Sequence, residues 1–233
     1  MTGLPIIADL ETCVHPEAAT YLPPPALEYL TAPKNYSKPE TIEQWKVDEK
    51  ARRIKGWEDD LERCALDPDL CRIVAIGYMR ARDEDVTTLL CPTEEDEKVA
   101  LETFWSEARQ AMLIGYNFAG FDAPILMRRS LLLGVKAPGL YISKYKHPSI
   151  VDVMKILSFD NLFTYRKQSF YLKRFGLDVP EDTTTGADIA QLVHEGNWDA
   201  VRHHVRCDVL GCRALAAHIG LIPKAQAVEE AVL

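Results

Sequence analysis

The chain alternates short apolar segments with longer segments that have the spacing of amphipathic helices. Three segments are apolar and rich in β-branched residues, which favours buried strands: residues 4–10, 72–79 and 112–116. Three others repeat apolar residues every three or four positions, which predicts helices with one packed face: residues 93–110, 122–133 and 197–219. With a further strand at 85–91, this order predicts an α/β fold in which helices flank a mixed β-sheet.

A long insertion separates the first two predicted strands. Residues 16–39 are rich in proline, including Pro23, Pro24 and Pro25, which predicts an irregular connection. Residues 41–66 have helical apolar spacing with dense mixed charge around a thin apolar stripe, which is typical of one long, partly exposed helix or of two helices. We therefore expect a single domain over residues 1–233 with a loop-plus-helix insertion at about 13–66. Short helices are expected at 151–157, 169–175 and 187–195.

The composition excludes several classes of protein. Of the 233 residues, 47% are hydrophobic and 27% are charged, which is typical of a soluble globular protein and not of a disordered or fibrous chain. No apolar stretch approaches the roughly 20 residues of a membrane helix, and the N-terminus lacks the basic start of a signal peptide. We expect a cytoplasmic protein with six reduced cysteines and no membrane partner. The formal charge of −8 argues against a simple nucleic-acid binder with a basic surface.

Two acidic residues lie at the end of the first predicted strand. Asp9 and Glu11 are two positions apart, so the alternation of a strand points both side chains to the same face. Two like charges on one face repel each other unless they are solvated or a cation lies between them. This pair alone is compatible with a solvated strand end and with a cation site.

Two further acidic residues occur at positions that a purely structural role explains poorly. Asp122 lies at a strand-to-helix junction, where open α/β sheets bind ligands, although a carboxylate there can also cap the helix. Asp208 lies beside the apolar stripe of the last predicted helix, where an unpaired charge is unfavourable. Four carboxylates at three separated points of the chain therefore indicate a shared role.

The segments around these acids resemble the three motifs of the DnaQ-like (DEDD) 3′-5′ exonuclease superfamily, whose fold is ribonuclease H-like. The three matches are Ile6-Ile7-Ala8-Asp9-Leu10-Glu11-Thr12, Asn117-x-x-x-Phe121-Asp122 and His204-x-x-x-Asp208-Val209. The residues that precede the third motif and the strand at 72–79 resemble the family-B-polymerase-type and phage-type branch. The resemblance extends from Leu4 to about Ile219.

This resemblance implies a metal-dependent 3′-5′ exonuclease that hydrolyses terminal phosphodiesters, favours single-stranded DNA and releases nucleoside 5′-monophosphates. Its four acids, here Asp9, Glu11, Asp122 and Asp208, would hold two divalent cations, Mg²⁺ or Mn²⁺, which hard oxygen ligands suit. The expected partners are nucleic acid 3′ ends and a polymerase or another replication or repair protein. The expected setting is DNA repair or proofreading in the cytoplasm, with a bacterial or phage-encoded enzyme as the type.

The family also needs a residue that orients or deprotonates the attacking water, and its branches place that residue four or five positions before the last acid. This chain has a histidine at each position, His204 and His203. A helix turns by about 100° per residue, so His204 shares the face of Asp208 and His203 does not. We favour His204 as the catalytic histidine. His203 is the alternative if the helix begins or kinks between the two.

Substrate contacts are expected in the motifs and in two other segments. The resemblance implies that Asn117 and Phe121 shape the pocket for the terminal nucleotide, and that Leu10 and Thr12 flank the scissile end. Phe121 is equally compatible with a core position. Basic and aromatic residues gather at 144–147 and 165–174, a combination that binds the phosphates and bases of single strands.

Two other functions remain compatible with the sequence. An RNA-trimming 3′-5′ exoribonuclease would use the same acids, and recognition of the 2′-hydroxyl depends on local geometry that no motif encodes. A non-catalytic accessory subunit of nucleic-acid processing would keep the fold, but the complete set of four acids argues against it. Asp152 resembles an acid of the family that binds no metal.

Overall fold

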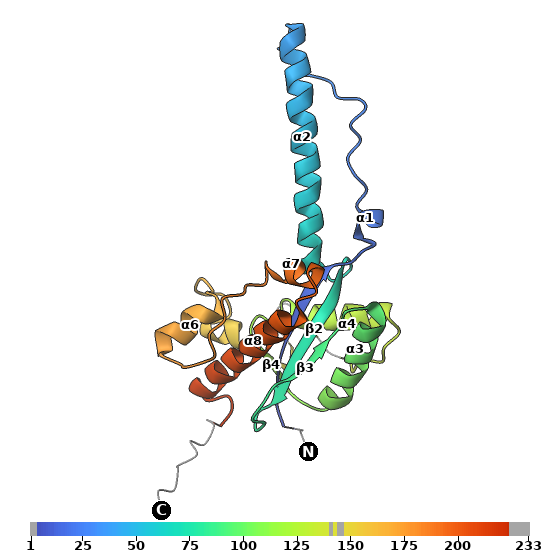
Figure 1. The fold of residues 1–233 in the computed structure, drawn as a ribbon. Coiled ribbons are helices and arrows are strands. Elements are labelled where there is room, and N and C mark those ends of the chain that lie inside the picture. The colour runs from blue at the N-terminus through green and yellow to red at the C-terminus, as the bar shows by residue number, and fades with distance from the viewer. Residues whose placement is uncertain (1–3, 140–141, 144–146, 224–233) are drawn as a thin grey trace, which may run out of the picture.

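The computed structural model describes residues 4–139, 142–143 and 147–223, and its strands form one mixed sheet with the order β3-β2-β1-β4-β5 (Figure 1). The strands are β1 (Ile6–Val14), β2 (Cys71–Arg80), β3 (Thr87–Leu90), β4 (Leu113–Gly115) and β5 (Ile150–Asp152). β1 lies in the middle of the sheet, antiparallel to β2 and parallel to β4. The predicted α/β class with a mixed sheet is confirmed.

Helices cover both faces of this sheet. α3 (Glu94–Ala108) and α4 (Asp122–Leu132) pack on the face that carries Ile6 and Leu10 of β1. The opposite face carries Ile7 and packs against the long C-terminal helix α8 (Trp198–His218). Three shorter helices pack on the same side as α8: α5 (Val153–Leu157), α6 (Gln168–Phe175) and α7 (Ile189–His194).

The insertion between β1 and β2 projects away from the sheet. It contains α1 (Ala18–Tyr21), the 25-residue helix α2 (Pro39–Arg63) and a 3-10 helix at Cys64–Leu66. Figure 1 shows α2 extending beyond the other elements, with the proline-rich segment running beside it. No residue of α2 is buried, and ion pairs such as Lys55–Asp59 at 2.6 Å line its surface. The indole N–H of Trp57 donates to the Leu22 carbonyl at 2.8 Å and ties the two segments together.

Helix boundaries agree with the sequence where capping residues are present. Thr93 and Asp96 form a reciprocal capping box at the start of α3, and the Asn197 side chain accepts the Ala200 N–H at the start of α8. Gly134 follows α4 with a φ of 68°, a left-handed conformation that glycine adopts without a Cβ clash. None of the helices in the described ranges combines the length and apolarity needed to cross a bilayer.

Several predicted segments differ from the structure. The segment at 151–157, expected to be a helix, begins as the strand Ile150–Asp152 and continues as the helix α5. The strand pairs in parallel with β4 over only three residues, which is too short for its sequence to show the alternation of a strand. The first strand continues to Val14 instead of ending at residue 10, since its polar residues pair along β2. The segment between β1 and β2 therefore begins after Val14, close to the expected start at about residue 13. α1 is a short helix within the segment expected to be irregular.

Candidate active site

β1 carries the first two acids toward α8. Ile7 belongs to the apolar cluster on the α8 side of the sheet, and Asp9 and Glu11 follow it at two-residue spacing. A register shift between Glu11 and Thr12 interrupts the pairing with β2 directly after the second acid. Such bulges re-aim the side chains beside them, and here the bulge lies at the end of the acidic pair.

α8 lies close enough to the sheet to bring two more polar side chains over β1. A Cβ atom at Gly77 of β2 would lie 2.9 Å from Cγ2 of Val205, a separation that packed side chains do not tolerate. Glycine at this position therefore allows the helix to approach the sheet. His204 and Asp208, one helical turn apart, flank this point of contact.

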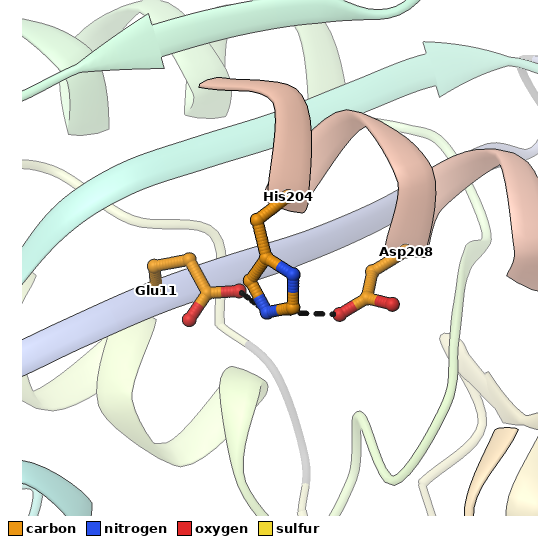
Figure 2. A group of neighbouring side chains, drawn as sticks. All are labelled: Glu11, His204 and Asp208. Carbon is orange, nitrogen blue, oxygen red and sulfur yellow. Dashed lines mark ion pairs between the residues drawn. The ribbon is translucent and has the colours of Figure 1, made fainter. Parts of the chain in front are cut away.

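The closest group in the site consists of Glu11, His204 and Asp208 (Figure 2). Nε2 of His204 lies 3.4 Å from Oε1 of Glu11 and 3.7 Å from Oδ2 of Asp208. Figure 2 shows the imidazole between the two carboxylates, with the histidine and Asp208 projecting from the same helix. One ligand atom from each of the three residues falls within 4.8 Å of the others. His204 is buried, whereas Asp208 keeps part of its surface exposed.

Asp122 joins this group from the other side of β1. It is the first residue of α4, is 2% exposed, and its Oδ1 accepts the backbone N–H of Leu10 at 3.2 Å. The N-cap of α4 is Phe121, and no side chain caps that helix. The alternative in which Asp122 serves as a helix cap is therefore wrong. Its carboxylate fixes the junction between β1 and α4 instead.

The acids shift one another's pKa values upward. Burial raises the pKa of Asp9 well above its ordinary value, and the charges of Asp122, Asp208 and Glu11 raise it further. The pKa of Glu11 is raised for the same reasons, first burial and then the nearby carboxylates. Burial also raises the pKa of Asp122 and of Asp208. The four carboxylates therefore form one electrostatically strained cluster.

The donor set of this cluster fits divalent cations. Among the residues that the structure describes, no lysine or arginine forms an ion pair with any of the four acids. Carboxylate oxygens that repel one another at one site are the ligands that Mg²⁺ and Mn²⁺ prefer. The residues present thus fit a metal centre with Asp9, Glu11, Asp122 and Asp208 as its oxygen donors.

The two candidate histidines have different surroundings. His204 faces the acids, while its Nδ1 lies 2.5 Å from Oδ2 of Asp182. His203 is exposed, and its Nε2 lies 3.1 Å from the Glu181 carbonyl oxygen on the loop before α7. α8 is continuous through both residues, so the kink on which the His203 alternative depended is absent.

Of the four residues expected to contact substrate, one lines a cavity. Asn117, with a φ of 61°, borders a cavity of about 380 Å³. The Thr12 hydroxyl donates to the Ala65 carbonyl at 2.6 Å, which makes it a link between β1 and the 3-10 helix. Leu10 is buried in the core, and Phe121 packs partly buried against the same cluster.

The cavity beside Asn117 is lined by the aromatic and basic segment, and one of its lining residues, Gln168, contacts Asp208. Its walls include Tyr165, Arg166 and Lys167, and the side-chain N–H of Gln168 donates to the Asp208 carbonyl oxygen at 3.1 Å. Tyr165 is 60% exposed, so its ring is free to meet a ligand from solvent. The other basic segment expected to bind substrate falls at 144–147, of which residues 144–146 lie outside the described residues.

Two polar residues near the site, Asp182 and Gln168, were not singled out as site residues from the sequence. Asp182 contacts His204 and Gln168 contacts Asp208, but both reach the site from loops or helices whose position no motif encodes. Asp152, set aside as a non-ligand, is buried and accepts the backbone N–H groups of Asn117 and Ala119, each at 3.1 Å. It therefore shapes the loop that carries the second motif.

Comparisons with known proteins agree with this architecture. The chain is similar to an uncharacterized protein of Methanocaldococcus jannaschii, with 32% identity over 163 residues, 64% of this chain and 86% of that protein. Its structure is similar to the family B DNA polymerase from the hyperthermophilic archaeon Pyrobaculum calidifontis, with a TM-score of 0.59 and 14% sequence identity. That match covers 93% of this chain and 24% of the polymerase, and it supports the ribonuclease H-like exonuclease fold.

A family match identifies the chain more directly. Residues 65–215 match the family described as predicted 3′-5′ exonuclease related to the exonuclease domain of PolB. The matched range contains Asp122, His204 and Asp208, while Asp9 and Glu11 precede it on the far side of the insertion. The chain thus belongs to the family of predicted 3′-5′ exonucleases related to the exonuclease domain of PolB.

Proposed function

We propose that this protein is a metal-dependent 3′-5′ exonuclease that hydrolyses the terminal phosphodiester of single-stranded DNA and releases nucleoside 5′-monophosphates. The observation that carries the proposal is the proximity of Asp9, Glu11, Asp122 and Asp208 to one another and of His204 to Glu11 and Asp208. The relation to the PolB exonuclease domain supports proofreading or repair at DNA 3′ ends as its setting, alone or beside a polymerase.

In this mechanism the four acids would hold divalent cations, and the histidine accepts a proton from the attacking water. Two divalent cations at the four carboxylates would supply an activated water and neutralise charge on the phosphate. His204 is the general base, because its Nε2 faces Glu11 and Asp208 and imidazole is a side chain that can accept a proton from water. The Gln168 side-chain N–H donates to the Asp208 carbonyl oxygen at 3.1 Å and to its Oδ1 at 3.4 Å, and the second contact helps to orient that carboxylate.

The surface beside the site favours a single strand as the substrate. Asn117 and the exposed ring of Tyr165 border the cavity, and Arg166 and Lys167 add positive charge to its wall. Stacking on aromatic rings requires unpaired bases, whereas cations bind the phosphates of any strand. The terminal nucleotides would therefore separate from a complementary strand before they enter the cavity.

The test uses single-stranded DNA and RNA oligonucleotides labelled at the 5′ end, incubated with the protein and Mg²⁺ or Mn²⁺. The proposal predicts a ladder that shortens from the 3′ end, release of nucleoside 5′-monophosphates, and loss of both in EDTA and in Asp9→Asn. Faster shortening of RNA than of DNA would instead support the RNA-trimming function. The same products from wild type and Asp9→Asn would contradict the proposal, and the absence of products from wild type would favour a non-catalytic accessory role.

A further inference from the structure

Asp182 lies in the loop between α6 and α7, directly opposite the face of α8 that carries His204. Its Oδ2 lies 2.5 Å from Nδ1 of His204, and its Oδ1 accepts the backbone N–H of Thr184 at 2.9 Å. Both oxygens of the carboxylate therefore have a hydrogen-bond partner. The side chain is 13% exposed, so little water competes for these contacts.

The carboxylate acts as an acceptor toward the imidazole. Burial raises the pKa of Asp182, but the hydrogen bonds from His204 and Thr184 outweigh it and hold the pKa below its ordinary value. An ionised carboxylate has no proton to donate, so the ring proton of a neutral His204 must lie on Nδ1. Nε2 then carries the lone pair, and it is the atom that faces Glu11 and Asp208.

The loop that carries Asp182 is fixed at several points. Nε2 of His203 lies 3.1 Å from the Glu181 carbonyl oxygen, so two consecutive histidines of α8 contact two consecutive residues of the loop. Further along, Oδ2 of Asp188 accepts the N–H of Thr185 at 2.8 Å and its hydroxyl at 2.7 Å. These bonds limit the positions that the Asp182 carboxylate can adopt.

We infer that Asp182 is a positioning residue that holds His204 in the tautomer with its proton on Nδ1 and its Nε2 lone pair directed at the acidic cluster. The inference rests on the proposed function for its catalytic consequence, but the tautomer is a property of the protein itself. A carboxylate that orients a catalytic imidazole in this way also stabilises the imidazolium that forms when the base takes a proton.

The direct test is a long-range ¹H–¹⁵N correlation spectrum of metal-free, ¹⁵N-labelled protein at a pH at which His204 is neutral. The expected spectrum shows a pyrrole-type nitrogen at Nδ1 and a pyridine-type nitrogen at Nε2 of His204. Asp182→Ala should mix or invert this pattern, whereas Glu181→Gln, which removes an exposed charge from the neighbouring residue, should leave it unchanged. A proton on Nε2 in wild type, or an identical pattern in Asp182→Ala, would overturn the inference.

Kinetics supply the second test. Asp182→Asn should lower kcat by about 10²-fold or more, with KM and the affinity for Mn²⁺ measured by calorimetry within about twofold of wild type. Asp182→Glu should recover part of kcat, because it keeps the acceptor. Full kcat in Asp182→Asn would count against the role. A wild-type protein without nuclease activity would refute the proposed function, while the spectra would still decide the tautomer.

Discussion

His203 and His204 are adjacent in the sequence, but the turn of the helix gives them different neighbours. About 100° of rotation separates them, so one faces the acids of the sheet and the other faces the loop at Glu181. The four-residue spacing to Asp208 favoured His204 on the condition that the helix is continuous. α8 is continuous through both histidines, so it places only His204 on the face of Asp208.

This difference predicts a large loss of kcat on substitution of His204 and a small change on substitution of His203. His204→Gln should lower kcat by about 10²- to 10⁴-fold, the usual contribution of a positioned general base. His203→Gln should keep kcat within about threefold of wild type, because the ring contacts a loop carbonyl and not the acids. Single-turnover assays on single-stranded DNA would measure both rates. The reverse order of the two variants would assign the base to His203.

The crowding of the acids predicts that Asp9 lowers the stability of the metal-free protein. Asp9→Asn should raise the free energy of unfolding by about 1 kcal/mol in EDTA, because it removes one member of a cluster whose charges repel. Urea unfolding would measure the change. In wild type, Mn²⁺ at about 100 times its Kd should add about 2.7 kcal/mol, and Asp9→Asn should lose most of that gain.

Asp178→Asn is the matched control, since this exposed aspartate lies away from the cluster. It should change neither the stability in EDTA nor the gain from Mn²⁺. A destabilised Asp9→Asn protein in EDTA would show that the carboxylate stabilises the fold through its own contacts.

Among the elements, α2 differs from the other helices because it packs against almost nothing. Its apolar residues form a thin stripe, and its stability depends on pairs such as Arg53–Glu49 at 2.8 Å, whose individual contributions are small and screened by salt. The apolar spacing and mixed charge of the sequence predicted one long, partly exposed helix or two helices, and the structure has one helix without a buried residue. The direction in which it projects could not be predicted, since no contact pattern in the sequence encodes it.

Removal of most of the insertion, residues 23–56 (the arm), should leave the sheet intact. Trp57 contacts the Leu22 carbonyl at the base of the arm, so a short Gly-Ser linker can replace residues 23–56. The shortened protein should keep the thermal midpoint of the sheet domain within a few degrees and keep the stabilisation by Mn²⁺. Differential scanning calorimetry with and without Mn²⁺ would measure both. A collapse of the midpoint would show that the arm contributes to the core.

The short elements show where sequence patterns stop being informative. β4 and β5 have three residues each, and the apolar run at 112–116 identified only the first. Ile150–Asp152 ends in a residue whose side chain accepts the N–H of Lys155, so the strand merges with α5 without a visible break. Tertiary pairing with β4 decides its conformation, and that pairing joins residues far apart in the chain.

Across the whole molecule, the sheet brings together residues that the insertion separates in sequence. The family match begins at residue 65, yet β1 pairs with β2 and β4 in the centre of the sheet and returns Asp9 and Glu11 to the site. The four acids and His204 were predictable because each lies in a motif. Asp182 was not, since a loop places it beside α8 and nothing in its own sequence marks it.

The net charge of −8 includes the four neighbouring acids of the site, whose charge two divalent cations would offset. Substrate must then be held by local features, of which the ring of Tyr165 is exposed beside the cavity. Tyr165→Ala should raise the Kd for single-stranded DNA by about 5- to 100-fold, the range of one lost base–aromatic stack. Tyr29→Ala, 90% exposed on the insertion, should have no effect.

Fluorescence anisotropy in the His204→Gln background with Mn²⁺ would measure binding without turnover. Equal weakening by both tyrosine variants would indicate non-specific contact instead of a defined path for the strand.

The proposed function requires that the four carboxylates form a two-cation hydrolytic centre beside His204. Anomalous diffraction from crystals grown with Mn²⁺ and a nucleoside 5′-monophosphate tests it most directly. A two-cation centre predicts two Mn²⁺ peaks about 3.5–4 Å apart, ligated by Asp9, Glu11, Asp122 and Asp208, with the product phosphate beside them. Absence of Mn²⁺ from these carboxylates, or a single ion bound elsewhere, would contradict it.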